Sequence, residues 1–387
     1  MKILQVIPYF IPAYKFGGPV KVCFDVSKEL VNRGHDVTVV TTDTLDGIKR
    51  IEARTEDIEG IHVIRFRNIS NHLVKYFNGY LPAGFYTWLK NNVSAYDIAY
   101  CHDYFTLQNI ITSHFCRKYN VPYMVQPHGT LALVRQKARF KNIKYLFHAI
   151  FKNVLKHAKY IVALTLNEKI EISTIYSNAK SKIKVIPNGI NMNEFIAISK
   201  YDLHSKFGIP EANKIIAYIG RIQYIKGIDI SLTILSAIKN KLNFTFLIIG
   251  PDEGEKYKLE QQIIALGLKN QVLFTGQLEG MEKLMTIKSC DLFLFTSRSE
   301  GLPMTVLEVA ALGVPQIISE NCNVPELAIT KAGFVIKEDQ IDIATDLILK
   351  ILEDQDLQDS LSLNAVKMVR KYFDLNIVCD QIEYICS

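Results

Sequence analysis

The chain of 387 residues has no apolar run long enough to span a membrane, no internal repeat and no low-complexity segment. Its opening residues, Met-Lys-Ile-Leu-Gln-Val-Ile-Pro, are too short an apolar stretch for a signal peptide. Since a membrane-spanning helix needs about 20 apolar residues, we expect a cytoplasmic protein without a span. A composition of 49% hydrophobic and 22% charged residues is that of a globular chain long enough for two domains.

The seven cysteines include no Cys-x-x-Cys pair and no histidine spacing suited to zinc. We expect reduced thiols, most of them buried. The loop after the first apolar run lacks Gly-x-Gly-x-x-Gly, which disfavours a nicotinamide dinucleotide fold. An Asp-x-Asp pattern occurs at Asp354 and Asp356, but it lies in a polar helical stretch away from every predicted strand. We interpret it as solvated surface and predict no metal site.

The net charge of +6 is too small to indicate nucleic acid as a partner, although the charge is unevenly distributed. Residues 135–159 contain eight Lys or Arg residues, no Asp or Glu, and aromatic residues at helical spacing. Such a segment can dock on an anionic membrane surface, which would make the protein peripheral at the inner face of the cell membrane. It can equally be a core-packing helix with a solvated basic face, and both interpretations stay open.

Short apolar runs alternate with longer helical patterns along the whole chain, which is typical of parallel βαβ units. In the first half we predict strands at residues 3–8, 37–41, 62–66, 98–101, 123–126, 161–164 and 183–186. In the second half we predict strands at residues 215–219, 245–249, 272–274, 292–296 and 316–318. Most runs are apolar throughout, as expected where helices cover both faces of a sheet. The predicted fold class is therefore α/β, with two doubly wound Rossmann-like domains that meet near Pro187 and Asn188.

The segment Glu300-Gly-Leu-Pro-Met-Thr-Val-Leu-Glu308 follows one predicted strand and precedes another. It indicates a loop and a helix that opens at Pro303, with one carboxylate before the helix and one inside it. In an open α/β sheet, ligands bind where loops leave the carboxyl ends of the strands. We therefore interpret Glu300 and Glu308 as candidate ligand-binding residues, although Glu308 can also be a solvated helix carboxylate.

Arg221 and Lys226 follow the first strand of the second half and flank a glycine turn. An arginine fork and a lysine point charge at a strand end can together neutralise a diphosphate. Each charge-assisted bond is typically worth about 1.5 to 3 kcal/mol. The alternative is that both are surface cations paired with carboxylates.

Taken jointly, several motifs resemble those of the retaining glycosyltransferases of family 4, which have the GT-B fold of two Rossmann-like domains facing a cleft. The resemblance covers nearly the whole chain and rests on the motifs Phe-Gly-Gly-Pro at 16–19, Pro-His-Gly-Thr at 127–130, Pro-Asn-Gly-Ile at 187–190, Gly-Arg at 220–221, Lys-Gly at 226–227 and the two glutamates at 300 and 308. It implies an acceptor-binding domain over 1–187 and a nucleotide-sugar-binding domain over 188–367. It also implies that a C-terminal helix over 368–387 returns to the first domain.

The resemblance assigns roles to the C-terminal residues. Arg221 and Lys226 would clamp the diphosphate of the donor and stabilise the leaving group in place of a metal. Glu308 would accept hydrogen bonds from the ribose hydroxyls. Glu300 would lie near the donor sugar, as a nucleophile or as an electrostatic stabiliser. The backbone amides of Gly301 and Leu302 would bind the sugar or phosphate.

In the N-terminal half, Gly17 and Gly18 would let the backbone approach the phosphate or the acceptor. His128 matches a family histidine that faces the donor sugar, although a lone histidine is more often structural. His102 and Asp103 end the fourth strand and either belong to the acceptor pocket or cap the following helix. Asn188 contacts the cleft or shapes the turn that joins the domains.

The sequence departs from the common family pattern in one place. That pattern has a Gly-Phe-Gly-Leu-Pro type loop after the first glutamate, whereas Gly-Leu-Pro follows Glu300 directly here, with the spacing to Glu308 intact. The loop faces the donor sugar, so the identity of the sugar stays open. We predict a metal-independent, retaining hexosyltransferase that uses a nucleotide-sugar donor and a glycan or lipid-linked acceptor, in the biosynthesis of a bacterial surface polysaccharide such as lipopolysaccharide. The alternatives are a sugar-nucleotide epimerase of GT-B fold and a non-catalytic nucleotide-sugar-binding protein.

Overall fold

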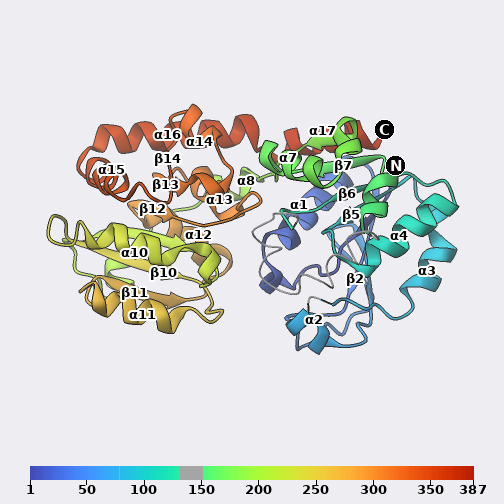
Figure 1. Cartoon of the computed structure of the whole chain (residues 1–387), viewed down its shortest axis with the longest axis horizontal. Coiled ribbons are helices and arrows are strands. Elements are labelled where there is room, and N and C mark those ends of the chain that lie inside the picture. Colours follow the sequence, from blue (N-terminus) through green and yellow to red (C-terminus); the bar gives the residue numbers. More distant parts are fainter. Residues whose placement is uncertain (78, 131–150) are drawn as a thin grey trace. The chain divides into compact units, whose positions relative to one another are not determined.

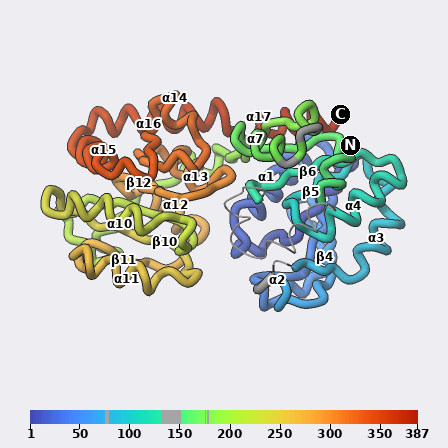
Figure 2. The backbone as a smooth tube through the Cα atoms, in the orientation of Figure 1, coloured from blue at the N-terminus to red at the C-terminus, as the bar shows by residue number. Residues whose placement is uncertain are grey.

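The computed structural model describes residues 1–77, 79–130 and 151–387, which form two compact units (Figure 1). Unit 1 consists of Met1–Gly189 together with Leu375–Ser387, and unit 2 consists of Ile190–Asp374. The backbone therefore leaves unit 1 once and returns to it for the last helix (Figure 2). Where it crosses, Ile190 and Asp374 form an isolated parallel bridge within unit 2.

Unit 1 is built on an eight-stranded sheet with the order β3-β4-β2-β1-β5-β6-β7-β8. All neighbouring strands are parallel except β3, which pairs antiparallel with β4 at the edge. The strands are β1 (Lys2–Val6), β2 (Asp36–Thr42), β3 (Thr55–Ile58), β4 (Ile61–Phe66), β5 (Ile98–His102), β6 (Tyr123–Gln126), β7 (Tyr160–Ala163) and β8 (Ile183–Val185). Every residue of β5 and β6 is buried, as predicted for strands covered on both faces.

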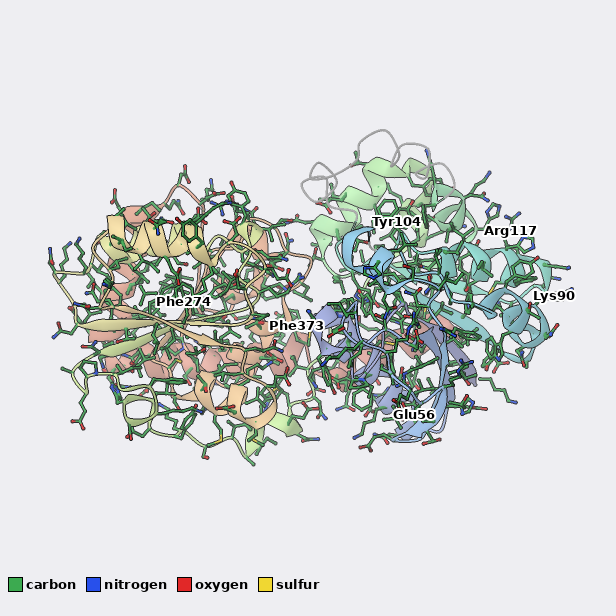
Figure 3. The ribbon with its side chains drawn as sticks, turned by 90° about the horizontal axis from the view of Figure 1, so that it is seen from below. Glu56, Lys90, Tyr104, Arg117, Phe274 and Phe373 are labelled. Carbon is green, nitrogen blue, oxygen red and sulfur yellow. The ribbon has the colours of Figure 1, made fainter. Side chains whose placement is uncertain are left out.

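Helices flank this sheet, with α1 against β2 and α4 against β5. The helices are α1 (Gly18–Asn32), α2 (Asn71–Phe77), α3 (Phe85–Asn92), α4 (Leu107–Lys118), α7 (Leu166–Ile175) and, from the end of the chain, α17 (Leu375–Cys386). Large aromatic side chains fill the layer between sheet and helices, and Tyr104 is fully buried there. Lys90 and Arg117, at the ends of α3 and α4, lie exposed on the outer surface of this unit (Figure 3).

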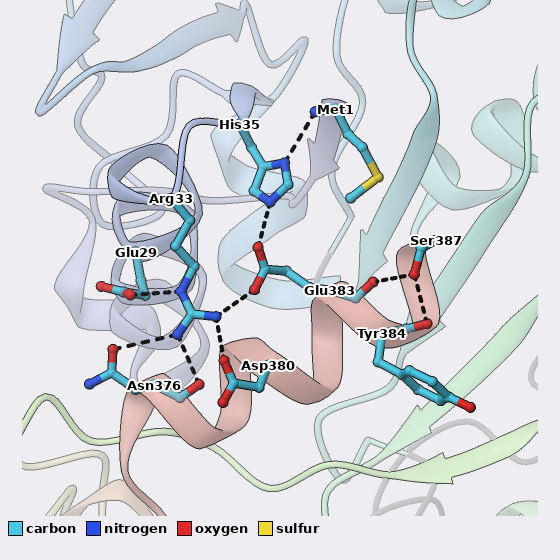
Figure 4. A network of polar contacts seen from close by, with 9 residues as sticks. All are labelled: Met1, Glu29, Arg33, His35, Asn376, Asp380, Glu383, Tyr384 and Ser387. Carbon is cyan, nitrogen blue, oxygen red and sulfur yellow. Dashed lines mark hydrogen bonds and ion pairs between the residues drawn. The ribbon is translucent and has the colours of Figure 1, made fainter.

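Helix α17 packs against α1 and is fixed there by Arg33, the residue that ends α1 (Figure 4). The Arg33 guanidinium lies 2.7 Å from Asp380 and 2.5 Å from Glu383, and it also donates to the backbone oxygen of Asn376. Glu383 reaches His35 at 2.6 Å as well. Apolar residues of α17 are buried beneath this layer of charges. The last helix of the chain is therefore an integral part of unit 1.

Unit 2 contains a six-stranded, fully parallel sheet with the order β11-β10-β9-β12-β13-β14. The strands are β9 (Lys214–Ile219), β10 (Phe244–Ile249), β11 (Val272–Gly276), β12 (Leu292–Phe295), β13 (Gln316–Ser319) and β14 (Phe334–Ile336). The helices are α8 (Asn193–Ile196), α9 (Leu203–Phe207), α10 (Ile228–Ser236), α11 (Lys256–Ala265), α12 (Gly280–Ser289), α13 (Met304–Ala311), α14 (Glu326–Ile329), α15 (Ile341–Glu353) and α16 (Gln355–Tyr372).

The prediction of two doubly wound α/β domains is confirmed, and each predicted strand overlaps an observed one. Two strands were not predicted. The edge strand β3 is polar and forms through its pairing with β4, while β14 has only three residues. The predicted start of the last helix, at residue 368, lies inside α16, and the helical break falls at residues 373–374 instead.

The remaining sequence predictions concern cysteines, membrane contact and the basic segment. All seven cysteines are free and buried, as predicted. Within residues 1–77, 79–130 and 151–387, no helix has the length and apolarity to span a membrane. Of the basic segment 135–159, residues 135–150 lie outside the described part of the chain. Its described end buries Phe151, Val154 and Leu155 in the core of unit 1.

Candidate functional site

In unit 2 the candidate residues gather at the point where the strand order reverses. The chain winds from β9 to β10 and β11 on one side, and through β12, β13 and β14 on the other. The loops that follow the adjacent strands β9 and β12 therefore diverge at the carboxyl edge of the sheet, which is where open α/β sheets bind ligands. Arg221 and Lys226 lie in the first of these loops, and Glu300 lies in the second.

Gly227 brings these two loops into contact. It has a φ of +64°, and a Cβ atom at this position would lie 2.0 Å from the backbone oxygen of Thr296. The Thr296 hydroxyl in turn donates to the backbone oxygen of Gly227 at 2.7 Å. A side chain at residue 227 would push the loops apart, so glycine is required both for the backbone conformation and for the close approach.

Lys226 and Glu300 form a largely buried ion pair across this contact. The distance from Lys226 Nζ to Glu300 Oε1 is 2.6 Å, and the two side chains are 15% and 7% exposed. The Ser297 hydroxyl donates to the same carboxylate oxygen at 2.7 Å, and the lysine ammonium lies 5.6 Å from the ring centre of Phe295. The structure therefore brings together two of the residues that sequence analysis singled out separately.

Glu308 is also buried and paired. Its side chain is 5% exposed, and both carboxylate oxygens accept hydrogen bonds from Lys283 Nζ, at 2.9 and 2.8 Å. The interpretation of Glu308 as a solvated helix carboxylate is therefore wrong. Lys283 offsets the cost of burying this carboxylate, which without a partner would be several kcal/mol. Lys283 lies on α12 and was not among the predicted residues.

Arg221 is more exposed than Lys226. Its guanidinium lies 3.4 Å from Glu253, and 43% of its side chain is accessible to solvent. Gln223 donates to the same Glu253 carboxylate. In this structure Arg221 thus fits the alternative interpretation of a cation paired with a carboxylate, although its place at the end of β9 is the predicted one.

The loop between Glu300 and helix α13 is buried and fixed by Asn323. The Asn323 side-chain amide donates to the backbone oxygen of Glu300 at 2.7 Å, and the Glu300 amide donates to the backbone oxygen of Asn321. Gly301, Leu302 and Pro303 are all buried, with Pro303 as the capping residue before α13. The loop after Glu300 is therefore held in a defined conformation.

A second bidentate pair, which sequence analysis missed, supports the loop after β12 from the other side. Arg298 donates to both carboxylate oxygens of Asp229, at 2.8 and 2.6 Å, and its guanidinium lies 4.1 Å from the ring centre of Tyr224. The residues on either side of Lys226 and Glu300 are thus tied together. No sequence motif predicts this pair, because its two members are 69 positions apart.

In unit 1 the predicted histidines meet at the carboxyl ends of β5 and β6. His102 Nδ1 lies 2.9 Å from His128 Nε2, and His102 Nε2 lies 2.7 Å from Gln5 Oε1. Burial lowers the pKa of His128 to about 3, and burial together with His128 holds the pKa of His102 well below its usual range. Both imidazoles are therefore neutral near pH 7. Gln5, on β1, is a residue that the sequence analysis did not select.

Asp103 and His128 share an unusual backbone conformation. Both are non-glycine residues with positive φ, of 62° and 54°, and they lie one and two residues after the ends of β5 and β6. Such strained positions are enriched at functional sites. Burial raises the pKa of Asp103 to about 6, while a hydrogen bond of 2.8 Å from the Tyr9 hydroxyl opposes this shift. The helix that follows is capped by Thr106, so the interpretation of His102 and Asp103 as the helix cap is wrong.

Glu168 fixes the turn that contains His128. This carboxylate is 2% exposed and accepts hydrogen bonds from the backbone amides of Gly129 and Leu164, at 2.7 and 2.6 Å. It lies in the first turn of α7, which Thr165 caps. The pattern of a threonine followed three residues later by a glutamate is a recognisable helix start, but it does not reveal the contact with Gly129.

Three further predicted residues lie in segments that shape the backbone. Gly17 has a φ of +92° and directly precedes helix α1, whose first residue is Gly18. A Cβ atom on Gly17 would meet nothing within 4 Å, so the backbone conformation alone favours glycine there. Asn188 is 5% exposed and lies two residues before Ile190, the first residue of unit 2.

The Asp-x-Asp pattern has a structural role at a helix start. Asp354 caps α16 by accepting a hydrogen bond from the Leu357 amide at 2.9 Å. Asp356 lies exposed in the first turn of the same helix. Over the described ranges of the chain, no group of three or more His, Cys, Asp or Glu side chains is arranged to hold a metal ion.

The sequence of this chain is similar to those of known glycosyltransferases. A model of "Glycosyltransferase Family 4" matches residues 16–194, and a model of "Glycosyl transferases group 1" matches residues 199–368. An uncharacterized glycosyltransferase of Methanocaldococcus jannaschii is 28% identical over 336 residues, which cover 82% of this chain and 80% of that protein.

Two further comparisons concern a galactosyltransferase and a solved structure. The UDP-Gal:alpha-D-GlcNAc-diphosphoundecaprenol alpha-1,3-galactosyltransferase of Escherichia coli is 27% identical over 304 residues, covering 73% of this chain and 75% of that protein. The Anabaena protein HepE, solved in complex with UDP, has a TM-score of 0.78 at 20% identity and covers 99% of both chains. The fold is thus that of the GT-B glycosyltransferases. Because the two family models together span nearly the whole sequence, the chain belongs to the group 1 glycosyltransferases of family 4.

Proposed function

We propose that this glycosyltransferase moves a sugar, with retention of anomeric configuration, from a nucleotide diphosphate sugar to a glycan or lipid-linked acceptor. The observation that carries the proposal is the pairing of Glu300 with Lys226 and of Glu308 with Lys283 around the carboxyl edge of β9 and β12. The two carboxylates are 7% and 5% exposed, and their lysines are 15% and 26% exposed. Buried charges at a strand-order reversal favour a ligand-binding role over a purely structural one.

In the proposed donor complex the diphosphate is bound by Arg221 and Lys226. Both follow β9, and the exposed guanidinium of Arg221 can leave Glu253 for a phosphate at little cost, because their distance is already 3.4 Å. Lys226 would keep Glu300 close while it contacts the phosphate. Glu308 would accept hydrogen bonds from the ribose hydroxyls, since a carboxylate has two oxygens that match a vicinal diol.

We propose that the departure of the nucleoside diphosphate needs no divalent metal. The argument is electrostatic: an arginine and a lysine at the same strand end stabilise negative charge that grows toward the transition state. Glu300, 2.6 Å from Lys226, would stabilise the positive charge that develops on the sugar. Gly301 and Leu302 would contribute backbone amides to the same ligand.

In unit 1 we propose that His128, Gly17 and Gly18 contribute to sugar and acceptor binding. His128 is held by His102 on one side and by a turn that Glu168 fixes on the other. Gly17 precedes α1 and Gly18 is its first residue, so no side chain at either position blocks an approaching ligand. Neutral imidazole nitrogens exchange hydrogen bonds with hydroxyl groups, which suits a sugar.

The acceptor and the pathway are proposed by analogy with the relatives. One is named as acting on a diphosphoundecaprenol-linked sugar, and another is named as an O-antigen biosynthesis glycosyltransferase. We propose the biosynthesis of a surface polysaccharide at the inner face of the cell membrane, with the basic segment 135–159 as the candidate membrane contact. Anionic vesicle binding that is unchanged when Lys137, Arg139, Lys141 and Lys144 all become Gln would contradict this contact.

The test measures nucleotide release from UDP, GDP and ADP sugars, with and without a lipid-linked acceptor, in the presence of EDTA. Acceptor-dependent release of one nucleotide with EDTA present supports metal-independent transfer, and the anomeric coupling constant of the product reports retention. Loss of activity on adding EDTA, or an inverted product, would overturn those parts of the proposal. Release that needs no acceptor would favour an epimerase or hydrolase. The matched variants are Glu308→Ala, expected to be inactive, and the exposed Glu338→Ala, expected to be active.

A further inference from the structure

Three buried polar side chains form a continuous row across neighbouring strands of unit 1. Gln5 comes from β1, His102 ends β5, and His128 follows β6, and these strands are adjacent in the sheet. Their exposed fractions are 0%, 1% and 7%. The two distances along the row, 2.7 and 2.9 Å, are those of good hydrogen bonds.

The donor and acceptor roles of the three side chains in this row depend on one another. Both imidazoles are neutral near pH 7, because burial lowers the pKa of His128 to about 3, and burial together with His128 holds the pKa of His102 well below its usual range. A neutral imidazole has one N–H donor and one acceptor nitrogen. His102 uses both nitrogens within the row, so if it donates at one end it must accept at the other.

Gln5 sets that direction. Its side-chain oxygen faces His102, so the proton of His102 is on Nε2 and its Nδ1 accepts. The proton shared by the two histidines must then be on Nε2 of His128. The remaining nitrogen of His128, Nδ1, consequently carries a lone pair and no proton.

We propose that Gln5 is a positioning residue that fixes the tautomer of His128, so that Nδ1 of His128 accepts a hydrogen bond from a hydroxyl group of the bound sugar. The identification of the ligand as a sugar rests on the proposed function, whereas the tautomer does not. The consequence is selectivity for a hydroxyl that donates: an analogue that bears fluorine in place of that hydroxyl can only accept, and it would bind poorly.

The burial of Gln5 supports a role beyond packing. Within the described residues, its side-chain nitrogen is buried without a hydrogen-bond partner, so the amide makes its hydrogen bond to His102 alone. Burying an unsatisfied amide costs free energy that an apolar residue at this position of β1 would avoid. Gln5 therefore serves His102, and through it His128.

The test is the ¹⁵N spectrum of the histidine rings in the ligand-free, full-length protein, with the His128 signals assigned from the spectrum of His128→Asn. We expect Nε2 of His128 to carry the proton and Nδ1 to show the shift of an unprotonated nitrogen. A proton on Nδ1 would overturn the proposal, whatever the variants do. Because no ligand is present, this result stands or falls separately from the transferase activity.

The variants test the role of Gln5 itself. Gln5→Met should turn the single His128 tautomer into a mixture and lower kcat for transfer about tenfold, the effect of one hydrogen bond of about 1.4 kcal/mol. Gln126→Met is the matched control, because Gln126 is a buried glutamine on β6 of the same sheet that bonds Tyr100 instead. It should leave the His128 tautomer unchanged.

Three outcomes are decisive. A single wild-type tautomer in Gln5→Met would show that Gln5 does not set it, and an equal change in Gln126→Met would show that any repacking of these strands suffices. If Gln5→Met does not fold, the wild-type spectrum still decides whether His128 carries its proton on Nε2. If the spectra agree with the proposal but no sugar is transferred, the tautomer stands and the proposed function fails.

Discussion

Lys226 Nζ and Glu300 Oε1 lie 2.6 Å apart, in a pair whose two side chains are 15% and 7% exposed. The lysine comes from the loop after β9 and the glutamate from the loop after β12, so the pair joins the two loops that diverge at the strand-order reversal. Each charge offsets the cost of burying the other. A diphosphate that binds Lys226 would therefore not displace Glu300 freely, because the carboxylate would be left buried without its cation.

We predict that Lys226→Met lowers the free energy of unfolding by about 3 kcal/mol, because it leaves the buried carboxylate of Glu300 without its cation. Adding Glu300→Gln to this variant should restore part of the loss. Urea denaturation followed by circular dichroism measures both effects. Lys258→Met is the control, since Lys258 is 71% exposed and its pair with Glu255 should contribute little. An equal effect of the two lysine variants would contradict the buried-pair interpretation.

Lys283 is predicted to hold Glu308 in place for the ribose. Lys283→Met removes both hydrogen bonds to the Glu308 carboxylate and should weaken binding of the nucleoside diphosphate by about tenfold or more, at about 1.5 kcal/mol or more for a charge-assisted bond. Isothermal titration calorimetry with UDP, or with whichever nucleotide is released, measures this. The control is Lys288→Met, since Lys288 lies on the same helix but donates to the backbone oxygen of Leu312. This variant should bind the nucleoside diphosphate as tightly as the wild type does.

Some of these site residues could be predicted from the sequence because of where they lie relative to the strands. Arg221, Lys226 and Glu300 lie in the loops that follow apolar strands, and neighbouring parallel strands bring such loops to one edge of the sheet. The pattern of apolar runs predicts the strands, and the places of these residues after the strands predict that they share one site. Lys283 gave no such signal, because it lies within a helix 25 positions before Glu308, and only the packing of α12 near α13 unites them.

Gln5 was overlooked although the sequence contains a hint of it. It is the only polar residue between Ile3 and Ile7, in a strand whose other buried residues are all apolar. A polar residue in a fully buried strand requires a partner. The partner could not be identified, because β5 lies 97 positions away and its pairing with β1 is a property of the whole sheet.

Asp103 gives a prediction for pH dependence. Its pKa rises from 3.8 to about 6 through burial, so ionisation opposes folding: the stability it contributes is complete below pH 3.8 and is lost as the pH rises through 6. At 1.36 kcal/mol per pKa unit, the loss is about 3 kcal/mol. Asp103→Asn should therefore become more stable relative to wild type as the pH increases from 4 to 7.

Melting temperatures of Asp103→Asn and wild type across this pH range check the prediction. The buried histidines shift stability in the opposite direction, because a lowered pKa favours the folded state above pH 6.5 and disfavours it below. They are present in both proteins, so their effect cancels in the difference. A constant difference for Asp103→Asn would contradict the raised pKa.

Gly227 and Gly208 provide a matched pair for the contact between the two loops of unit 2. Their φ angles are +64° and +65°, so alanine at either position meets the same backbone strain, about 1 to 2 kcal/mol. The surroundings differ: a Cβ at residue 208 would meet nothing within 4 Å, whereas at residue 227 it would lie 2.0 Å from the backbone oxygen of Thr296. Backbone cannot rotate away as a flexible side chain can.

We therefore predict that Gly208→Ala lowers the free energy of unfolding by that strain alone, and that Gly227→Ala costs more. The excess should be accompanied by weaker nucleotide binding, because separating the loops after β9 and β12 pulls Lys226 away from Glu300. Chemical denaturation gives the first quantity and calorimetric titration the second. If the two variants are equally stable and bind nucleotide equally well, the close approach of Gly227 to Thr296 does not position Lys226, and the geometry of the donor site must depend on other contacts.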